Sequence, residues 1–162
     1  MADHLRIEMS PPVDGGMMLR FSSGPQEFAA DFTTQVCPFF EAFCDAIRVL
    51  HDGFIDDRIR LLIGAPECDL LLQAAAHSSQ AVLKINLWPD HKRSTLVPEP
   101  TVFRFEGARQ EIISPFVAAL TSVRAGLSDA EFAQAYRAPF PTAAYAALMR
   151  RVQMTASDSI RT

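Results

Sequence analysis

The chain has 162 residues with a hydrophobic fraction of 49%, a charged fraction of 21% and a formal net charge of −4, values that favour one globular domain with a single core. The acidic balance argues against a nucleic-acid binder, which usually carries a basic patch, and no run reaches the roughly 20 apolar residues that span a bilayer. The N-terminus MADHLRIEMSPP lacks a basic start and an apolar run, so no secretion signal and no membrane partner are predicted and we expect a cytoplasmic protein.

The first part of the chain alternates apolar and polar residues, the pattern of half-buried strands. It predicts short strands at 5–9, 17–21 and 28–32, separated by turns that are rich in glycine, proline and serine. The second and third of these strands should pair antiparallel as a hairpin.

After Pro38 the period changes to that of an amphipathic helix, which Gly53 should end. Its apolar stripe is Phe39, Phe40, Phe43, Ile47 and Leu50. A row of aromatic rings can line a ligand pocket, but burial in the core is the stronger interpretation. The reason is energetic, because fully burying such a ring contributes about 1.5–3 kcal/mol.

Two strands joined at Ser78-Ser79 are expected to form the centre of the sheet. The segment 81–88, AVLKINLW, places Ala81, Leu83, Ile85 and Leu87 on one face and leaves Val82, Lys84, Asn86 and Trp88 on a wetter face. The segment 70–76, LLLQAAA, is apolar on both faces and fits a central strand or, less readily, a helical turn. Further strands are predicted at 58–63 and 101–105.

The remainder of the chain is helical in pattern. Pro115 must lie in the first turn of its helix or kink it, which makes Ser114 a candidate N-cap. Ser128-Asp129-Ala130-Glu131 matches a capping box and predicts a helix start. A last helix is expected at 142–152, followed by a flexible polar tail at 153–162.

These elements predict a single α+β domain over residues 1–152. Its antiparallel sheet would have about seven strands, with the Phe-rich helix packed on one face and two or three helices at the C-terminus.

The sequence offers little catalytic chemistry. The cysteines Cys37, Cys44 and Cys68 are odd in number and form no CxxC pair, so we expect buried structural thiols without disulfide or zinc. His77 stands beside Ser78, but neighbouring residues of a strand point to opposite faces and a solvated turn holds geometry poorly. We therefore predict no catalytic residue, no metal site and no cofactor.

Two loops place large apolar residues among charges, as protein-binding surfaces do. They are HDGFIDD at 51–57 and WPDHKR at 88–93. In the alternative interpretation, Phe54 and Ile55 simply fill the core where the chain leaves the helix. The candidate partner-binding residues are Asp52, Phe54, Asp56, Asp57, Trp88, Asp90 and His91.

The order of elements over residues 17–125 resembles that of small cytoplasmic immunity proteins of bacterial polymorphic toxin systems. The resemblance implies an inhibitor that binds and blocks one cognate toxin. A second hypothesis stays open, in which a cavity between the sheet and the helices binds an apolar small molecule or performs simple acid–base chemistry.

Overall fold

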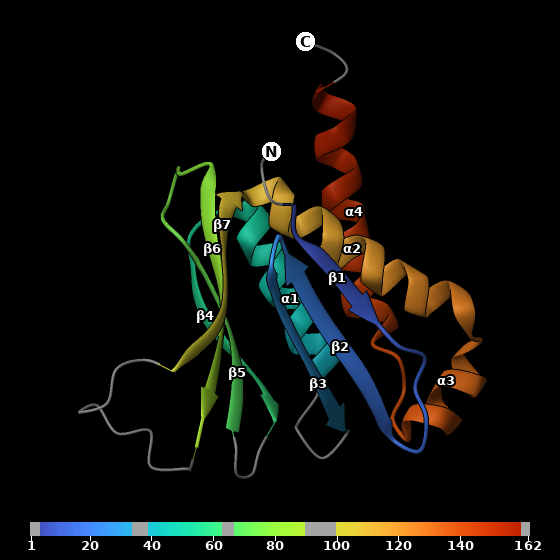
Figure 1. Ribbon diagram of the computed structural model, residues 1–162. Helices are drawn as coiled ribbons and strands as arrows, with labels where there is room; N and C mark the ends of the chain where they lie inside the picture. Colours follow the sequence, from blue (N-terminus) through green and yellow to red (C-terminus); the bar gives the residue numbers. More distant parts are fainter. Residues whose placement is uncertain (1–3, 34–38, 63–66, 90–99, 160–162) are drawn as a thin grey trace.

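The computed structural model describes residues 4–33, 39–62, 67–89 and 100–159 (Figure 1). In these residues it has seven strands and four helices, in the order three strands, one helix, four strands and three helices. All strand pairs are antiparallel. The predicted α+β class is confirmed.

The first sheet is a meander of three strands that pair in chain order. Alternation puts Met17, Leu19 and Phe21 on its buried face, as predicted. The strands are β1 (Arg6–Met9), β2 (Gly16–Ser23) and β3 (Gln26–Thr33).

The second sheet holds the predicted central hairpin and one strand on each side of it. Leu72 pairs with Leu83, and Ile85 pairs with Phe103, so the buried side chains of neighbouring strands lie side by side. The strands are β4 (Ile55–Leu62), β5 (Glu67–Ala74), β6 (Gln80–Trp88) and β7 (Thr101–Ala108).

The prediction of one continuous sheet was wrong, because β3 and β4 belong to different sheets. The 14-residue helix α1 (Phe39–Asp52) separates them in the chain and prevents a hairpin. The two sheets instead close their apolar faces on a shared core, which removes more apolar surface from water than one open sheet would. Phe21 of β2 lies 5.9 Å from Phe103 of β7 between ring centroids, which shows the sheets meeting.

Helix α1 supplies the centre of this core. Its whole predicted aromatic stripe is buried, and Phe43, Ile47 and Leu50 have no exposed surface. The ring of Phe43 meets Phe116 of α2 (Arg109–Gly126) edge to face at 4.5 Å. Helix α2 contacts β1 of one sheet and β6 and β7 of the other, so it bridges the two sheets.

Helix α2 begins at Arg109, so Pro115 lies inside the helix and the candidate N-cap Ser114 is not its N-cap. Its first turn is fixed by Glu111, whose Oε2 accepts a hydrogen bond from the backbone N–H of Ala108 at 2.7 Å. Pro115 removes one helical hydrogen bond inside α2, and burial of its neighbours Ile112, Ile113 and Phe116 compensates.

Two further helices complete the fold. The capping box at α3 (Asp129–Tyr136) is confirmed, since Ser128 Oγ accepts from the N–H of Glu131 at 3.3 Å and Glu131 Oε2 accepts from the N–H of Ser128 at 2.8 Å. The last helix, α4 (Thr142–Ser159), continues past its predicted end at Val152. It packs along α1, and its C-terminal end extends beyond the rest of the structure (Figure 1). Among the described helices, none combines the length and hydropathy of a membrane span.

Candidate functional site

The chain leaves α1 at Asp52 and enters β4 three residues later, and this short connection separates two neighbouring apolar residues. Ile55 is 3% exposed and joins the core, whereas Phe54 is 64% exposed. The interpretation that these residues fill the core therefore holds for Ile55 and not for Phe54. Of the twelve phenylalanines in the chain, ten are buried, Phe28 is half-buried and Phe54 alone is largely exposed.

Phe54 borders an open groove of about 340 Å³ at the end of the second sheet. The groove lies across the starts of β4 and β6 and the end of β5. Small side chains form much of its lining, because Ala74, Ala75 and Ala81 leave space where larger residues would fill it. Two further lining residues, Gln73 and Val82, pair with each other on the face of the sheet that points away from α1, here called the outer face.

Asp56 provides the charge at this groove. It pairs with Gln73 across the strands, and Gln73 Nε2 donates a hydrogen bond to Asp56 Oδ1 at 3.0 Å. Asp57 follows on the other side of β4, where its Oδ1 accepts from the backbone N–H of Arg58 at 2.8 Å. Both carboxylates are exposed, and neither forms an ion pair with another residue in the described part of the chain.

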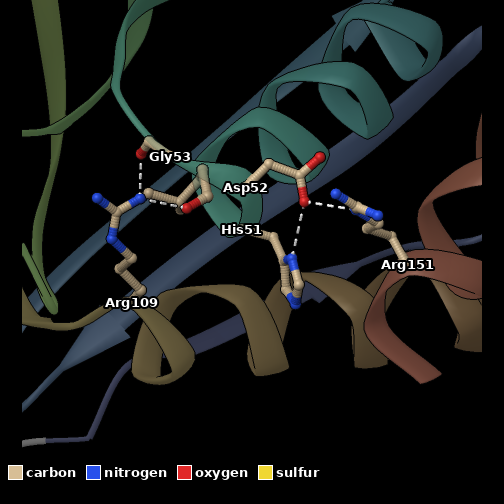
Figure 2. Close-up of polar contacts among 6 residues, drawn as sticks. His51, Asp52, Gly53, Arg109 and Arg151 are labelled. Carbon is tan, nitrogen blue, oxygen red and sulfur yellow. Dashed lines mark hydrogen bonds and ion pairs between the residues drawn. The ribbon is translucent and has the colours of Figure 1, made fainter. Parts of the chain in front are cut away.

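Asp52 is engaged differently from these two carboxylates. Its Oδ1 accepts from Arg151 Nε of α4 at 2.8 Å and from His51 Nδ1 at 3.1 Å, and Figure 2 shows the two donors on either side of it. Partial burial acts to raise the pKa of Asp52, but the hydrogen bonds from Arg151 and His51 together with their charges outweigh it and hold the pKa below the usual 3.8. Asp52 therefore joins α4 to the end of α1, and the guanidinium of Arg151 compensates its charge within the fold.

Sequence reasoning missed the residue that fixes this end of the molecule. Arg109 starts α2, and its guanidinium donates to four backbone carbonyls. Two carbonyls, those of Leu50 and Gly53, lie at the C-terminal end of α1, and the contact with Gly53 is drawn in Figure 2. The other two, of Ala75 and Ser78, belong to the β5–β6 turn and accept at 2.6 Å each. Since the acceptors are main-chain atoms, no side-chain pattern in the sequence marks them.

The prediction that Trp88 lies on a wet face was wrong. Alternation gave the correct face, but Trp88 is only 8% exposed and its Nε1 donates to Asp69 Oδ2 at 3.2 Å. Asp69 and Asn86, opposite each other in β5 and β6, are fully buried on the same face. The face is dry here because these large and polar side chains cover one another, and Arg58 adds an ion pair to Asp69 at 3.7 Å.

The seven candidate residues are therefore not one surface. Phe54 and Asp56 line the groove, Asp57 follows them on β4, Asp52 binds α4, and Trp88 is buried. The remaining two, Asp90 and His91, lie outside the described residues.

Two cysteine thiols and the Ser78 hydroxyl have structural roles in the described residues. Burial raises the pKa of the thiols of Cys44 and Cys68 to about 12, which removes the reactive thiolate at neutral pH and agrees with the structural role predicted for them. Cys37 lies outside the described residues. Ser78 Oγ accepts from the backbone N–H of Gln80 at 3.1 Å, an ordinary turn contact. The described residues hold no cluster of three His, Cys, Asp or Glu side chains that could bind a metal ion.

No protein-family model matches the chain, and comparisons with curated proteins and with solved structures likewise found no match.

Proposed function

We propose that this chain acts by binding another protein, and that its contact surface is the groove beside Phe54. The observation that carries the proposal is the 64% exposure of Phe54 in a chain that buries ten of its twelve phenylalanines. Keeping a phenyl ring in water forgoes about 1.5–3 kcal/mol of burial free energy. Aromatic residues that remain exposed beside a groove are typical anchors of protein interfaces.

The sharper form of the proposal is an immunity or inhibitor protein that neutralises a partner toxin or enzyme. Asp56 and Asp57 support it, because they form no ion pair within the described residues, and such carboxylates attract a basic surface and raise the rate of association. The ligand-cavity hypothesis has less support. The space between the sheets and α1 is occupied by the rings of Phe21, Phe43 and Phe116, and the groove beside Phe54 is open to solvent.

Site-specific photo-cross-linking tests the proposal. A benzoylphenylalanine is introduced at Phe54 in the cells from which the chain comes, and a second variant carries it at Val13, which is 68% exposed and lies between β1 and β2. We expect one protein to be conjugated at position 54 and not at position 13, and an excess of unmodified chain should compete it away. Equal labelling at the two positions, or no conjugate at position 54, would contradict the proposal.

The inhibitor role has its own readout. The captured protein should lose its enzymatic or toxic activity when the purified chain is added, and Phe54→Ala should restore it. Replacing both Asp56 and Asp57 by asparagine should slow association and weaken its dependence on salt, with little change in dissociation. A partner whose activity is unaffected by the chain would rule out inhibition while leaving binding intact.

A further inference from the structure

The groove beside Phe54 combines a carboxylate with an apolar lining, and this combination restricts what can occupy it. Ala75, Ala81 and Val82 contribute to this lining, together with the ring of Phe54. Asp56 is the charged lining residue. A purely apolar side chain placed here would remove water from Asp56 without compensating its charge, which is unfavourable.

Several carboxylates of the second sheet and of α1 pair with a cation, whereas Asp56, like its neighbour Asp57, forms no ion pair among the described residues. Asp69 pairs with Arg58 at 3.7 Å, and Glu106 pairs with Arg104 at 2.8 Å. Asp52 pairs with Arg151 at 2.8 Å. The hydrogen bond that Asp56 receives comes from the neutral amide of Gln73, which orients the carboxylate and leaves its charge in place.

We propose that the groove receives a lysine side chain of the bound partner protein. The assignment rests on the proposed function and adds the chemistry of the residue that the partner inserts. The aliphatic stem of lysine would lie on the alanines and Val82, and its ammonium group would reach Asp56 beside the ring of Phe54. The groove volume of about 340 Å³ is at the small end for ligand sites, which start near 300 Å³, and suits one long side chain.

Lysine fits this carboxylate better than arginine does. Arginine binds carboxylates most strongly as a fork that uses both oxygens. At Asp56 one oxygen, Oδ1, already accepts from Gln73 Nε2, which leaves Oδ2 as the open acceptor. A lysine ammonium is a point charge that needs a single oxygen, and the side-chain carbonyls of Gln73 and Gln80 at the groove offer further acceptors.

Peptide titration followed by NMR tests this assignment. The probes are acetyl-Val-Lys-Val-amide, the same peptide with an acetylated lysine, and acetyl-Val-Arg-Val-amide. We expect the lysine peptide to shift the side-chain amide signals of Gln73 and Gln80, and the acetylated peptide to leave them unchanged. Asp56→Asn should weaken binding of the lysine peptide about threefold to fivefold, the size expected of an exposed ion pair. The matched control Asp31→Asn, an exposed aspartate on β3, should have no effect.

Three results would overturn the assignment: equal binding of the acetylated peptide, tighter binding of the arginine peptide, or an unchanged affinity in Asp56→Asn. These failures are separate from a failure of the proposed function. If position 54 cross-links to a partner while the lysine peptide does not bind, the lysine assignment falls and protein binding stands. If the lysine peptide binds but no partner is conjugated at position 54, the groove recognises the ammonium group and the proposed function falls.

Discussion

Arg109 donates a hydrogen bond from Nη1 to the carbonyl of Leu50 at 2.6 Å, across 59 positions of the chain. The last carbonyls of a helix lack partners within the helix and carry partial negative charge, so a guanidinium placed there satisfies and stabilises them. Because the same guanidinium also binds the carbonyls of Ala75 and Ser78, it joins the end of α1 to the β5–β6 turn. The end of α1 directly precedes Phe54, and Ala75 of the turn lines the groove beside it. Arg109 therefore fixes the two segments that border this groove.

The first prediction is that Arg109→Ala destabilises the fold by about 2–4 kcal/mol, because several backbone carbonyls lose a charged donor at once. Chemical denaturation of the variant measures the loss. Arg150→Ala, on the exposed face of α4, is the matched control and should change stability by less than about 0.5 kcal/mol. Equal stability of the two variants would show that the four contacts of Arg109 contribute nothing.

The second prediction compares phenylalanines in two environments. Phe43→Ala removes a fully buried ring that contacts Phe39 and Phe116, and it should cost about 3–5 kcal/mol. Phe54→Ala removes a ring that is 64% exposed and should cost less than about 1 kcal/mol. Leu83→Ala in β6 should resemble Phe43→Ala, at about 2–5 kcal/mol. Urea denaturation measures these losses in unfolding free energy. Comparable losses for Phe43→Ala and Phe54→Ala would show that the ring of Phe54 is buried in solution.

The third prediction concerns acid. The pKa of Asp52 is lowered in the folded chain, so its contribution to stability is present above the unfolded-state value of 3.8 and is lost as the pH falls through the lower folded value. Asp52→Asn removes that contribution. The difference in unfolding free energy between the native chain and Asp52→Asn should be largest at neutral pH and should shrink once the pH passes below 3.8. A difference that does not vary with pH would contradict the contacts with Arg151 and His51.

The fourth prediction concerns the edge of the second sheet. Asp57 pairs with Leu72 and stands between the buried Ile55 and Ile59, so alternation places it on the core side of an edge strand, yet it is exposed. Its Oδ1 accepts a hydrogen bond from the backbone N–H of Arg58. An inward charge of this kind discourages edge-to-edge pairing. Asp57→Val should therefore increase self-association in analytical ultracentrifugation, whereas Asp57→Asn, which keeps the acceptor, should associate less than the valine variant.

Features that depend on local patterns could be predicted from the sequence. Alternation identified the strands and the face of Leu83, helical spacing identified α1, and the Ser128 box identified the start of α3. Each of these signals lies within a few residues, where periodicity and capping act.

Features that depend on distant segments could not be predicted. The role of Arg109 depends on carbonyls 31 to 59 positions away, which leave no mark on side-chain chemistry. Burial of Trp88 depends on Asp69 in the neighbouring strand, and the division into two sheets depends on how α1 and α2 cover both apolar faces. For the candidate site, the sequence named Phe54 and Asp56, but it could not separate exposed Phe54 from buried Ile55, because both are large, apolar and adjacent.

The central claim is that the contact surface is centred on Phe54. Its most direct test is the dissociation constant between the Phe54→Ala variant and the partner identified by cross-linking. An interface anchor contributes 2 kcal/mol or more, so affinity should fall by about thirtyfold or more, mainly through faster dissociation. Val13→Ala, a similarly exposed apolar residue between β1 and β2, should bind like the native chain. A loss of less than about threefold for Phe54→Ala, a free-energy change of roughly 0.7 kcal/mol, would show that the contact surface lies elsewhere.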